Sequence, residues 1–292
     1  MHIKDLQVFQ TVAEEGTITR AAEKLNYVQS NITSRIQKLE QTLNTPLFNR
    51  HRRGMNLTPE GKKLLTYSEK ILFLTDEMKK VLQSNEEPSG KLEIGSVETV
   101  IKLPHILNMY NNQYTNVDLS LYTGVTEDIR QDVLNHKLDG AFVIETDHHP
   151  DLVTHHVFEE ELVLISDAKT TSWDELKEAP FLCFNKGCAY RERLDAWYSD
   201  QNISPKKVME MGSFETILSS VAIGLGVTCV PRSSVSRQVK KGIIQCHPLP
   251  EKYSRIHTVF IRRKDSYLTT TIKKFIETIE QSKTDEQLPL TL

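Results

Sequence analysis

The sequence predicts an α/β protein built from three consecutive parts: a small helical domain, one long helix, and a larger domain of two α/β lobes. Through the first 83 residues, apolar side chains recur mostly at three- and four-residue steps, which is the period of an α-helix. The stretch SNEEPSG, residues 84–90, has the composition of a linker. Beyond it, strand-like and helix-like segments alternate, which indicates a parallel sheet with crossover helices.

Length and composition indicate a globular protein with more than one domain. The chain has 292 residues, of which 38% are hydrophobic and 26% are charged. Its apolar runs are far shorter than the roughly 20 residues that span a bilayer, and Asp5 and Gln7 stand where a signal peptide would be apolar. We therefore expect a cytoplasmic protein with no membrane partner. The four cysteines form no CxxC pair and are expected to be reduced thiols.

Two short helices open the chain. The first, at about 4–15, places Leu6, Phe9, Val12 and Ala13 on one face and ends at Gly16. Thr17 is a suitable N-cap for the second, at about 18–25, which Asn26 ends.

A third helix, at about 29–43, follows after a turn of only four residues, which is helix-turn-helix spacing (about 18–37). Its inward face is expected to hold Ile32, Ile36, Leu39 and Leu43. The front half of the helix is polar, although such residues favour caps and turns over helix interiors. Amide side chains can bond adenine, Arg can bond guanine, and hydroxyls can bond bases or phosphates. The predicted base-reading residues are Gln29, Ser30, Asn31, Thr33, Ser34 and Arg35. Taken alone, the same face could simply be solvated.

A basic hairpin follows the third helix and favours the nucleic-acid interpretation. TPLFNRHRRGMNLTPEGKKLL contains two short apolar pieces around a basic tip, as in the wing of a winged helix-turn-helix. Residues 1–65 hold ten Lys/Arg against six Asp/Glu, whereas the rest of the chain holds 26 against 33. A positively charged N-terminal part joined to a negatively charged remainder is expected if only the N-terminal part binds a polyanion. We predict a winged helix-turn-helix at 1–58 whose phosphate contacts are Arg20, Lys38, Arg50, Arg52 and Arg53, with a minor-groove position as the alternative for the last two.

One long helix is predicted from Pro59 to Gln83, with Thr58 as its cap. It carries an apolar stripe made of Leu64, Ile71, Leu74, Met78, Val81 and Leu82. A solitary helix of this length would be marginal in water, so a second copy is the expected partner of the stripe. Residues 59–90 are therefore predicted to form a dimerisation helix and hinge. Two paired chains would bind double-stranded DNA with a palindromic site.

The residues described so far resemble the N-terminal domain of LysR-type transcriptional regulators. The shared features are the helix end at Gly16, Thr19-Arg20-Ala21-Ala22, Leu39-Glu40, Leu47-Phe48-x-Arg50 and Leu57-Thr58-x-x-Gly61. SFETILSSVAIGLGVTCVP and YRERLDAW resemble the effector domain of that family. The resemblance implies a transcriptional regulator whose C-terminal domain is of periplasmic-binding-protein type, and pairing through that domain to a tetramer. Ser30 and Asn31 replace the commoner Pro-Ala type, and Thr33 stands where Ser is usual, so the base contacts are expected to differ.

The effector domain is predicted at 91–292, with lobe one at about 91–161 and 266–285 and lobe two at about 162–265. Ligands of α/β sheets lie outside the carboxyl ends of strands, often at helix N-termini. The loops at such positions give the candidate effector-binding residues Ser96, Thr99, Thr126, Gly187, Cys188, Ala189 and Tyr190, and a fourth loop lies near Pro231. Their hydroxyl and N–H groups suit a small-molecule effector, for example an anion, and no cofactor is expected. Thr99 and Thr126 could instead be helix N-caps.

Three other patterns resemble chemical sites. Cys188 stands at a predicted helix start near Arg191 and Arg193, and both features would lower the pKa of its thiol. LysR-type peroxide sensors, however, use a second Cys where this chain has Trp197. A packed thiol is therefore the simpler interpretation of Cys188. The histidines His148, His149, His155 and His156 lack the paired spacing of metal ligands, and no metal site is predicted.

Gly224 and Gly226 follow a helix and precede a strand, which is the reverse of a phosphate-binding loop, and predict a helix end and a tight turn. No nucleophile–base constellation, HExxH or GxSxG is present, so an enzyme is not expected. Two other classes remain open: a small-molecule binding protein whose N-terminal helices only mediate assembly, and a redox or metal sensor with the same DNA-binding head.

Overall fold

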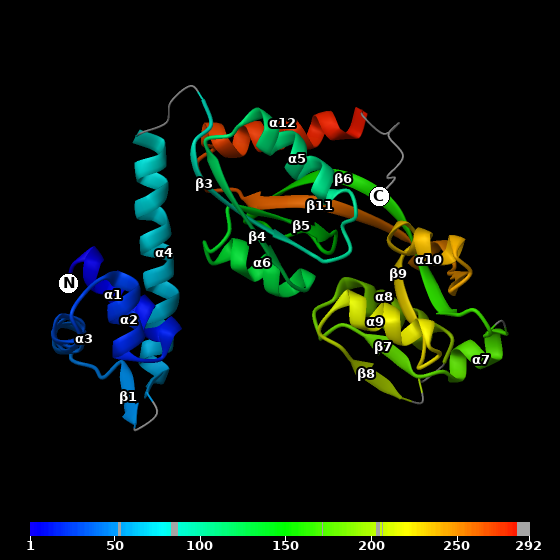
Figure 1. The fold of residues 1–292 in the computed structure, drawn as a ribbon, viewed down its shortest axis with the longest axis horizontal. Coiled ribbons are helices and arrows are strands. Elements are labelled where there is room, and N and C mark those ends of the chain that lie inside the picture. The colour runs from blue at the N-terminus through cyan, green and yellow to red at the C-terminus, as the bar shows by residue number, and fades with distance from the viewer. Residues whose placement is uncertain (52–53, 83–86, 171, 203–204, 206, 285–292) are drawn as a thin grey trace. The chain divides into compact units, whose positions relative to one another are not determined.

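The computed structural model describes residues 1–51, 54–82, 87–170, 172–202, 205 and 207–284. Two compact units are present (Figure 1): one comprises Met1–Gln83 with Asn135–Lys137, and the other comprises the remaining residues.

The N-terminal unit is a three-helix core with a two-stranded hairpin and a long helix. Its elements are α1 (Ile3–Glu15), α2 (Ile18–Leu25), α3 (Gln29–Leu43), β1 (Phe48–His51), β2 (Gly54–Leu57) and α4 (Pro59–Leu82). The residues expected to cap and end these helices are confirmed. Gly16 ends α1 with φ +67°, the Thr17 hydroxyl accepts the Arg20 amide at 3.3 Å, and Asn26 ends α2 in the left-handed conformation.

The core of this unit lies where α1, α2 and α3 meet the hairpin. Phe9, Val12, Ile32, Ile36 and Leu39 are almost fully enclosed. Leu43, which was expected to face inward, is 38% exposed because it lies in the last turn of α3, outside the cluster of packed side chains.

The hairpin and α4 are fixed by backbone contacts. The Met55 amide donates to the Gly16 carbonyl at 2.8 Å, and a Cβ on Gly54, whose φ is +140°, would lie only 2.5 Å from that same oxygen. The Thr58 hydroxyl accepts the Gly61 amide at 2.9 Å and donates to the Pro46 carbonyl, so it caps α4 as expected. The bond from Met55 to Gly16 therefore joins the start of β2 to the turn between α1 and α2.

The C-terminal unit has two lobes that share one seven-stranded sheet. Its larger elements are β3 (Gly90–Ser96), α5 (Leu103–Gln113), β4 (Val117–Thr123), α6 (Thr126–Leu134), β5 (Gly140–Ile144), β6 (Leu152–Asp167), β7 (Phe181–Cys183), α8 (Ala189–Asp200), β8 (Val208–Glu210), α9 (Phe214–Ala222), β9 (Thr228–Pro231), β10 (Ile244–Pro248), β11 (Arg255–Arg263) and α12 (Thr270–Thr284). Four short helices were not predicted: α7 (Trp173–Glu178), the 3₁₀ turn Arg232–Val235, α10 (Ser236–Lys240) and α11 (Glu251–Ser254). β10 was not predicted either.

The sheet is mixed, which corrects the expectation of a parallel one. Its order is β10-β6-β11-β5-β3-β4, with β9 also paired to β6. β3 is parallel to β4 and β5, whereas β11 is antiparallel to both β5 and β6. The long strand β6 pairs with β11 as far as Glu161 and with β9 from Leu162, so it passes from one lobe to the other.

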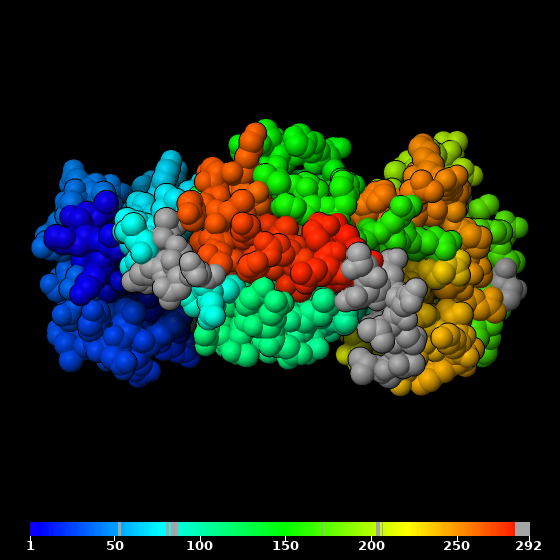
Figure 2. All heavy atoms as spheres, turned by 90° about the horizontal axis from the view of Figure 1, so that it is seen from above, coloured from blue at the N-terminus to red at the C-terminus, as the bar shows by residue number. Residues whose placement is uncertain are grey.

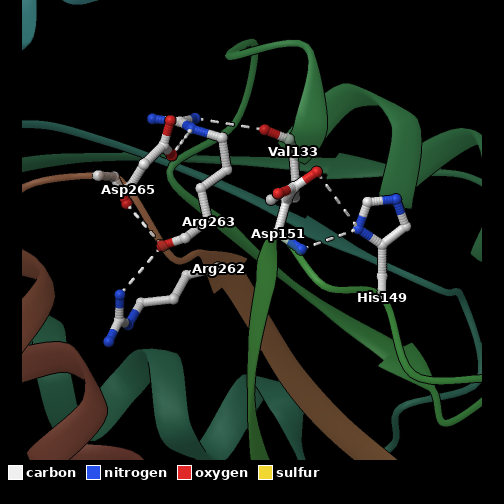
Figure 3. A network of polar contacts seen from close by, with 7 residues as sticks. Val133, His149, Asp151, Arg262, Arg263 and Asp265 are labelled. Carbon is white, nitrogen blue, oxygen red and sulfur yellow. Dashed lines mark hydrogen bonds and ion pairs between the residues drawn. The ribbon is translucent and has the colours of Figure 1, made fainter.

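A second correction concerns β11, which was assigned to lobe two from its sequence position but lies between β5 and β6 in the sheet of lobe one. Where β11 ends, Arg263 is buried and donates to the Val133 carbonyl near the end of α6 and to Asp265 (Figure 3). On one face of this sheet α12 lies beside α5 (Figures 1 and 2), and the Tyr110 hydroxyl donates to the Thr271 carbonyl at 2.9 Å. β11 and α12, which come late in the chain, therefore complete lobe one.

Candidate nucleic-acid interface and ligand cleft

The polar front of α3 lies on the surface of the N-terminal unit. Gln29, Ser30, Asn31 and Ser34 are exposed, while Ile32 and Ile36 are fully buried and hold the helix against α1 and α2. Thr33 is half-buried, and its hydroxyl donates to the Gln29 carbonyl at 2.9 Å. The exposed amides and hydroxyls have the donors and acceptors needed to bond base edges in a major groove.

Arg35 differs from the other residues of this face, because it is engaged within the protein. Its Nη1 donates to Asp5 Oδ1 at 2.7 Å and its Nε donates to Asn31 Oδ1 at 2.9 Å. Asp5 is 3% exposed, and its second oxygen accepts the His2 amide at 2.8 Å. Burial opposes ionisation of Asp5, but the His2 amide and Arg35 outweigh it and lower the pKa of that carboxyl.

The predicted phosphate contacts surround this face only in part. Arg20, Lys38 and Arg50 are exposed. Arg50 lies 3.8 Å from Glu40, whose Oε1 accepts the Leu47 amide, so the Leu39-Glu40 motif also organises the start of the hairpin. The two arginines expected at the hairpin tip, Arg52 and Arg53, lie outside the described residues.

The C-terminal unit has two adjoining pockets where its lobes meet. The inner pocket encloses about 20 Å³, and the outer one about 230 Å³. An enclosed space of about 20 Å³ holds a single water molecule. Five of the seven predicted effector-binding residues line the inner pocket, namely Thr99, Thr126, Cys188, Ala189 and Tyr190.

Two predicted residues do not line either pocket. Ser96 is 1% exposed and its hydroxyl donates to the Val97 carbonyl. Gly187 instead presents its carbonyl to the Glu127 amide at 3.1 Å. The loop near Pro231 is also not part of the cleft, since Pro231 pairs with Leu162 in the sheet.

Several lining residues were missed by sequence reasoning. Val97, Gly124, Val125, Ile144 and Phe184 line the inner pocket but have no polar group that marks them as ligand contacts. Glu98 lines both pockets and stands in the same GSVETV loop as Ser96 and Thr99, so attention to acidic residues in that loop would have found it.

Hydrogen bonds of the chain itself cross this cleft. Thr99 Oγ1 and the Tyr190 hydroxyl are 2.5 Å apart in a buried pair. Glu98 Oε2 accepts the Phe214 amide at 2.7 Å, and the Glu127 amide donates to Gly187. Thr99 is therefore not an N-cap of α5, which begins at Leu103 with Lys102 in the cap position, and Thr126 is the first residue of α6. These three bonds join the two lobes across the cleft.

Cys188 is not an activated thiol in this arrangement. It occupies the N-cap of α8, but burial raises the pKa of its thiol, and the amides of Arg191 and Tyr190 lower that pKa by less. The Arg191 guanidinium donates to Glu210 at 2.7 Å instead. This agrees with the simpler interpretation of Cys188 as a packed thiol, and not with a thiol activated by the helix start and the neighbouring arginines.

The histidine-rich segment has local polar contacts. The Asp151 amide donates to His149 Nδ1 at 3.2 Å (Figure 3), which makes that ring nitrogen an acceptor within its own turn. Within the described ranges of the chain, no group of three or more His, Cys, Asp or Glu side chains is placed to hold a metal ion.

Comparison with known proteins identifies the family. Residues 3–62 match the model of the bacterial regulatory helix-turn-helix proteins of the lysR family, and residues 85–283 match the LysR substrate binding domain. The chain belongs to the LysR family. One relative is the HTH-type transcriptional regulator SoxR of Arthrobacter sp. (strain TE1826), 53% identical over 97% of this chain and 98% of the relative. Another is the HTH-type transcriptional regulator CzcR of Bacillus anthracis, 51% identical over 96% of this chain and 98% of the relative.

The fold of this LysR-type protein also matches that of CbnR in complex with its target DNA, with a TM-score of 0.69, 21% identity, and coverage of 97% of this chain and all of that one (100%). The protein is therefore a DNA-binding transcriptional regulator with a substrate-binding effector domain. Its relatives are named as regulators and not as enzymes. No helix in the part of the chain that the structure describes is long and apolar enough to cross a membrane.

Proposed function

We propose that this LysR-type regulator acts in the cytoplasm, reads a palindromic DNA site with the front of α3 in two paired chains, and is controlled by a small molecule bound between the lobes of its C-terminal unit. The exposed polar front of α3 is the observation that carries the proposal. Four exposed side chains with amide or hydroxyl groups stand on a helix whose opposite face is buried, and the same unit carries the exposed cations Arg20 and Arg50. The amide and hydroxyl side chains would read base edges, and the two arginines would bind phosphates.

Pairing through α4 supports the two-fold site. Tyr67, Leu74, Met78 and Leu82 are 50–78% exposed, and Ile71 is 37% exposed, at helical spacing along α4. Leu64, in contrast, packs against the core of its own unit. An exposed stripe of this kind is covered when two helices pair, and further pairing of the effector domains would give a tetramer.

The chemistry of the cleft favours an effector with a different charge from the anion expected from the sequence. Glu98 and Asp128 line the outer pocket, and its described lining residues include neither Lys nor Arg. The amide of Glu127 at the start of α6, which would suit an anion, already donates to Gly187. We infer that a cationic or donor-rich neutral molecule suits this site better than a carboxylate, because two carboxylates would repel the latter.

Footprinting on the DNA that flanks the protein's own gene, across a salt series, tests the main proposal. We expect a protected palindrome and a linear fall of log K with log salt, because each phosphate contact releases counterions. A flat salt response without a protected site would instead favour a small-molecule binding protein whose N-terminal helices only mediate assembly.

The proposal about effector charge has its own test. A thermal-shift screen of the full-length protein, with matched sets of small amines and small carboxylates, should raise Tm with the amines. Glu98→Gln should weaken that shift, and a carboxylate that raises Tm equally in both proteins would contradict the inferred charge.

A further inference from the structure

Two of the five N–H donors of the Arg35 guanidinium are committed inside the N-terminal unit. Two of its three nitrogens, Nη1 and Nε, already donate to Asp5 and Asn31. A bidentate contact with guanine needs two nitrogens of the same fork. A contact made through the Nε edge of the guanidinium would therefore compete with the bond to Asn31.

Asp5 is a firm anchor for this arrangement. The carboxylate is almost completely buried, and both of its oxygens are used, one by Arg35 and the other by the His2 amide at the start of α1. Separating the pair would leave the buried Asp5 carboxylate without its charged partner, although Arg35 itself is half-buried. Arg35 is thus held from α1, an element that carries none of the proposed base-reading residues.

Asn31 receives its orientation from Arg35. Arginine nitrogens can only donate, so the atom of Asn31 that faces Nε must be the carbonyl oxygen Oδ1, and the amide nitrogen Nδ2 must occupy the other position. Asn31 is exposed in the first turn of α3, where recognition helices meet base edges. An Asn without such a partner can turn its amide either way, and it bonds adenine with both atoms.

We propose that Asp5 and Arg35 are positioning residues that fix Asn31 with its Nδ2 donor outward, so that Asn31 selects a base with a major-groove acceptor and rejects cytosine. Purines offer N7 and thymine offers O4 as acceptors, whereas the major-groove edge of cytosine offers the N4 donor. This inference rests on the proposal that the front of α3 reads DNA. It gives Arg35 a positioning part in addition to any contact of its own, and it gives the buried Asp5 a part in specificity.

Asn31→Asp is the decisive variant, because it keeps an acceptor for Arg35 and replaces the outward donor with a second acceptor. The full-length protein would first select its site from a library of duplexes with random sequence. Affinity would then be measured for the four duplexes that differ at each single position of the selected half-site. We expect the wild type to disfavour cytosine at one position by about fivefold or more, and Asn31→Asp to prefer cytosine there. A uniform loss of affinity for all four bases would overturn the proposal.

Asp5→Asn tests the anchor, with thermal unfolding as the check that the unit remains folded. It should relax the preference at the same single position, while the slope of log K against log salt stays unchanged, because no phosphate contact is lost. The matched control is Glu14→Gln, which removes the same charge from an exposed pair with Lys24 and should leave every base preference intact. An unaltered preference in Asp5→Asn, or a slope reduced by about one in Arg35→Gln, would show that Arg35 acts on the DNA directly. If the wild type selects no sequence at all, the proposed function itself fails.

Discussion

Tyr190 is buried where α8 meets the loop after β3, and its hydroxyl bonds a Thr99 hydroxyl that is itself only 1% exposed. Tyr190→Phe should lower the free energy of unfolding by about 1–2 kcal/mol, because it leaves the Thr99 hydroxyl buried without a partner. Thr99→Val should do the same from the other side of the cleft. The double variant should be less destabilised than the sum, since neither polar group then remains, and denaturant unfolding of all four proteins measures the coupling. Additive losses would show that the two hydroxyls do not depend on each other.

Asp5 predicts a pH dependence of stability in the N-terminal unit. Its pKa in the folded protein is below the ordinary value of 3.8, so the folded state favours the ionised form. The contribution of Asp5 is therefore complete above about pH 5 and disappears as the pH falls through the lowered pKa. Relative to Asp5→Asn, the wild type should be more stable by about 2 kcal/mol at pH 7, and the difference should shrink toward zero near pH 2. Urea unfolding at several pH values measures this, and a difference that persists at pH 2 would contradict it.

A single element could be predicted from the sequence when the residues that determine it lie within or beside that element. The prediction of α2 agrees with the structure at both ends, because Thr17 and Asn26 act on their own turns. β11 was recognised as a strand but placed in the wrong lobe, because its partners β5 and β6 are distant in sequence and no residue of β11 encodes that pairing. Leu43 fits the helical spacing of the apolar face, but it lies beyond the end of the packed core. Only the tertiary structure shows where that core ends.

The same distinction applies to the two candidate sites. The front of α3 could be identified from residue type and spacing, because a surface helix presents its side chains in a fixed pattern. The sequence could not show that Arg35 is engaged by Asp5, 30 residues away in the chain. In the cleft, selection by hydroxyl groups found Thr99 and Thr126, but it also chose Ser96, whose hydroxyl bonds the Val97 carbonyl, and it passed over apolar residues such as Phe184.

At the scale of the long helix, the exposed stripe of α4 predicts the effect of a single charge. Leu74 is 50% exposed in the middle of the stripe, and Leu74→Glu should halve the mass of the assembly, because two carboxylates cannot be buried opposite each other. DNA affinity should fall by about a hundredfold, since two half-sites are no longer held in one complex. Light scattering and DNA titration measure the two effects. Asp76→Lys, which alters an exposed residue of α4 outside the stripe, should change neither.

At the scale of the whole molecule, the two functions are linked by thermodynamics. If a molecule in the cleft weakens or strengthens DNA binding by some factor, DNA must change the affinity for that molecule by the same factor. If such coupling operates here, the conformation with the Thr99–Tyr190 and Glu98–Phe214 bonds would be one of the two states that it requires. An effector controls the protein only to the extent that it binds this state and an open one differently.

The arrangement of half-sites gives the last prediction, which belongs to the paired molecule. Two α3 helices held by paired α4 helices can enter major grooves only if both half-sites face the same side of the duplex, about 10 base pairs or a multiple apart. Inserting five base pairs between the half-sites turns one of them to the opposite side and should weaken binding about a hundredfold, because only one reader then engages. Inserting ten base pairs returns both half-sites to the same side of the duplex, so affinity should recover at least in part. Titration of three duplexes that differ only in spacing measures this, and equal affinity for all three would mean that the two readers bind independently and that α4 does not hold them together.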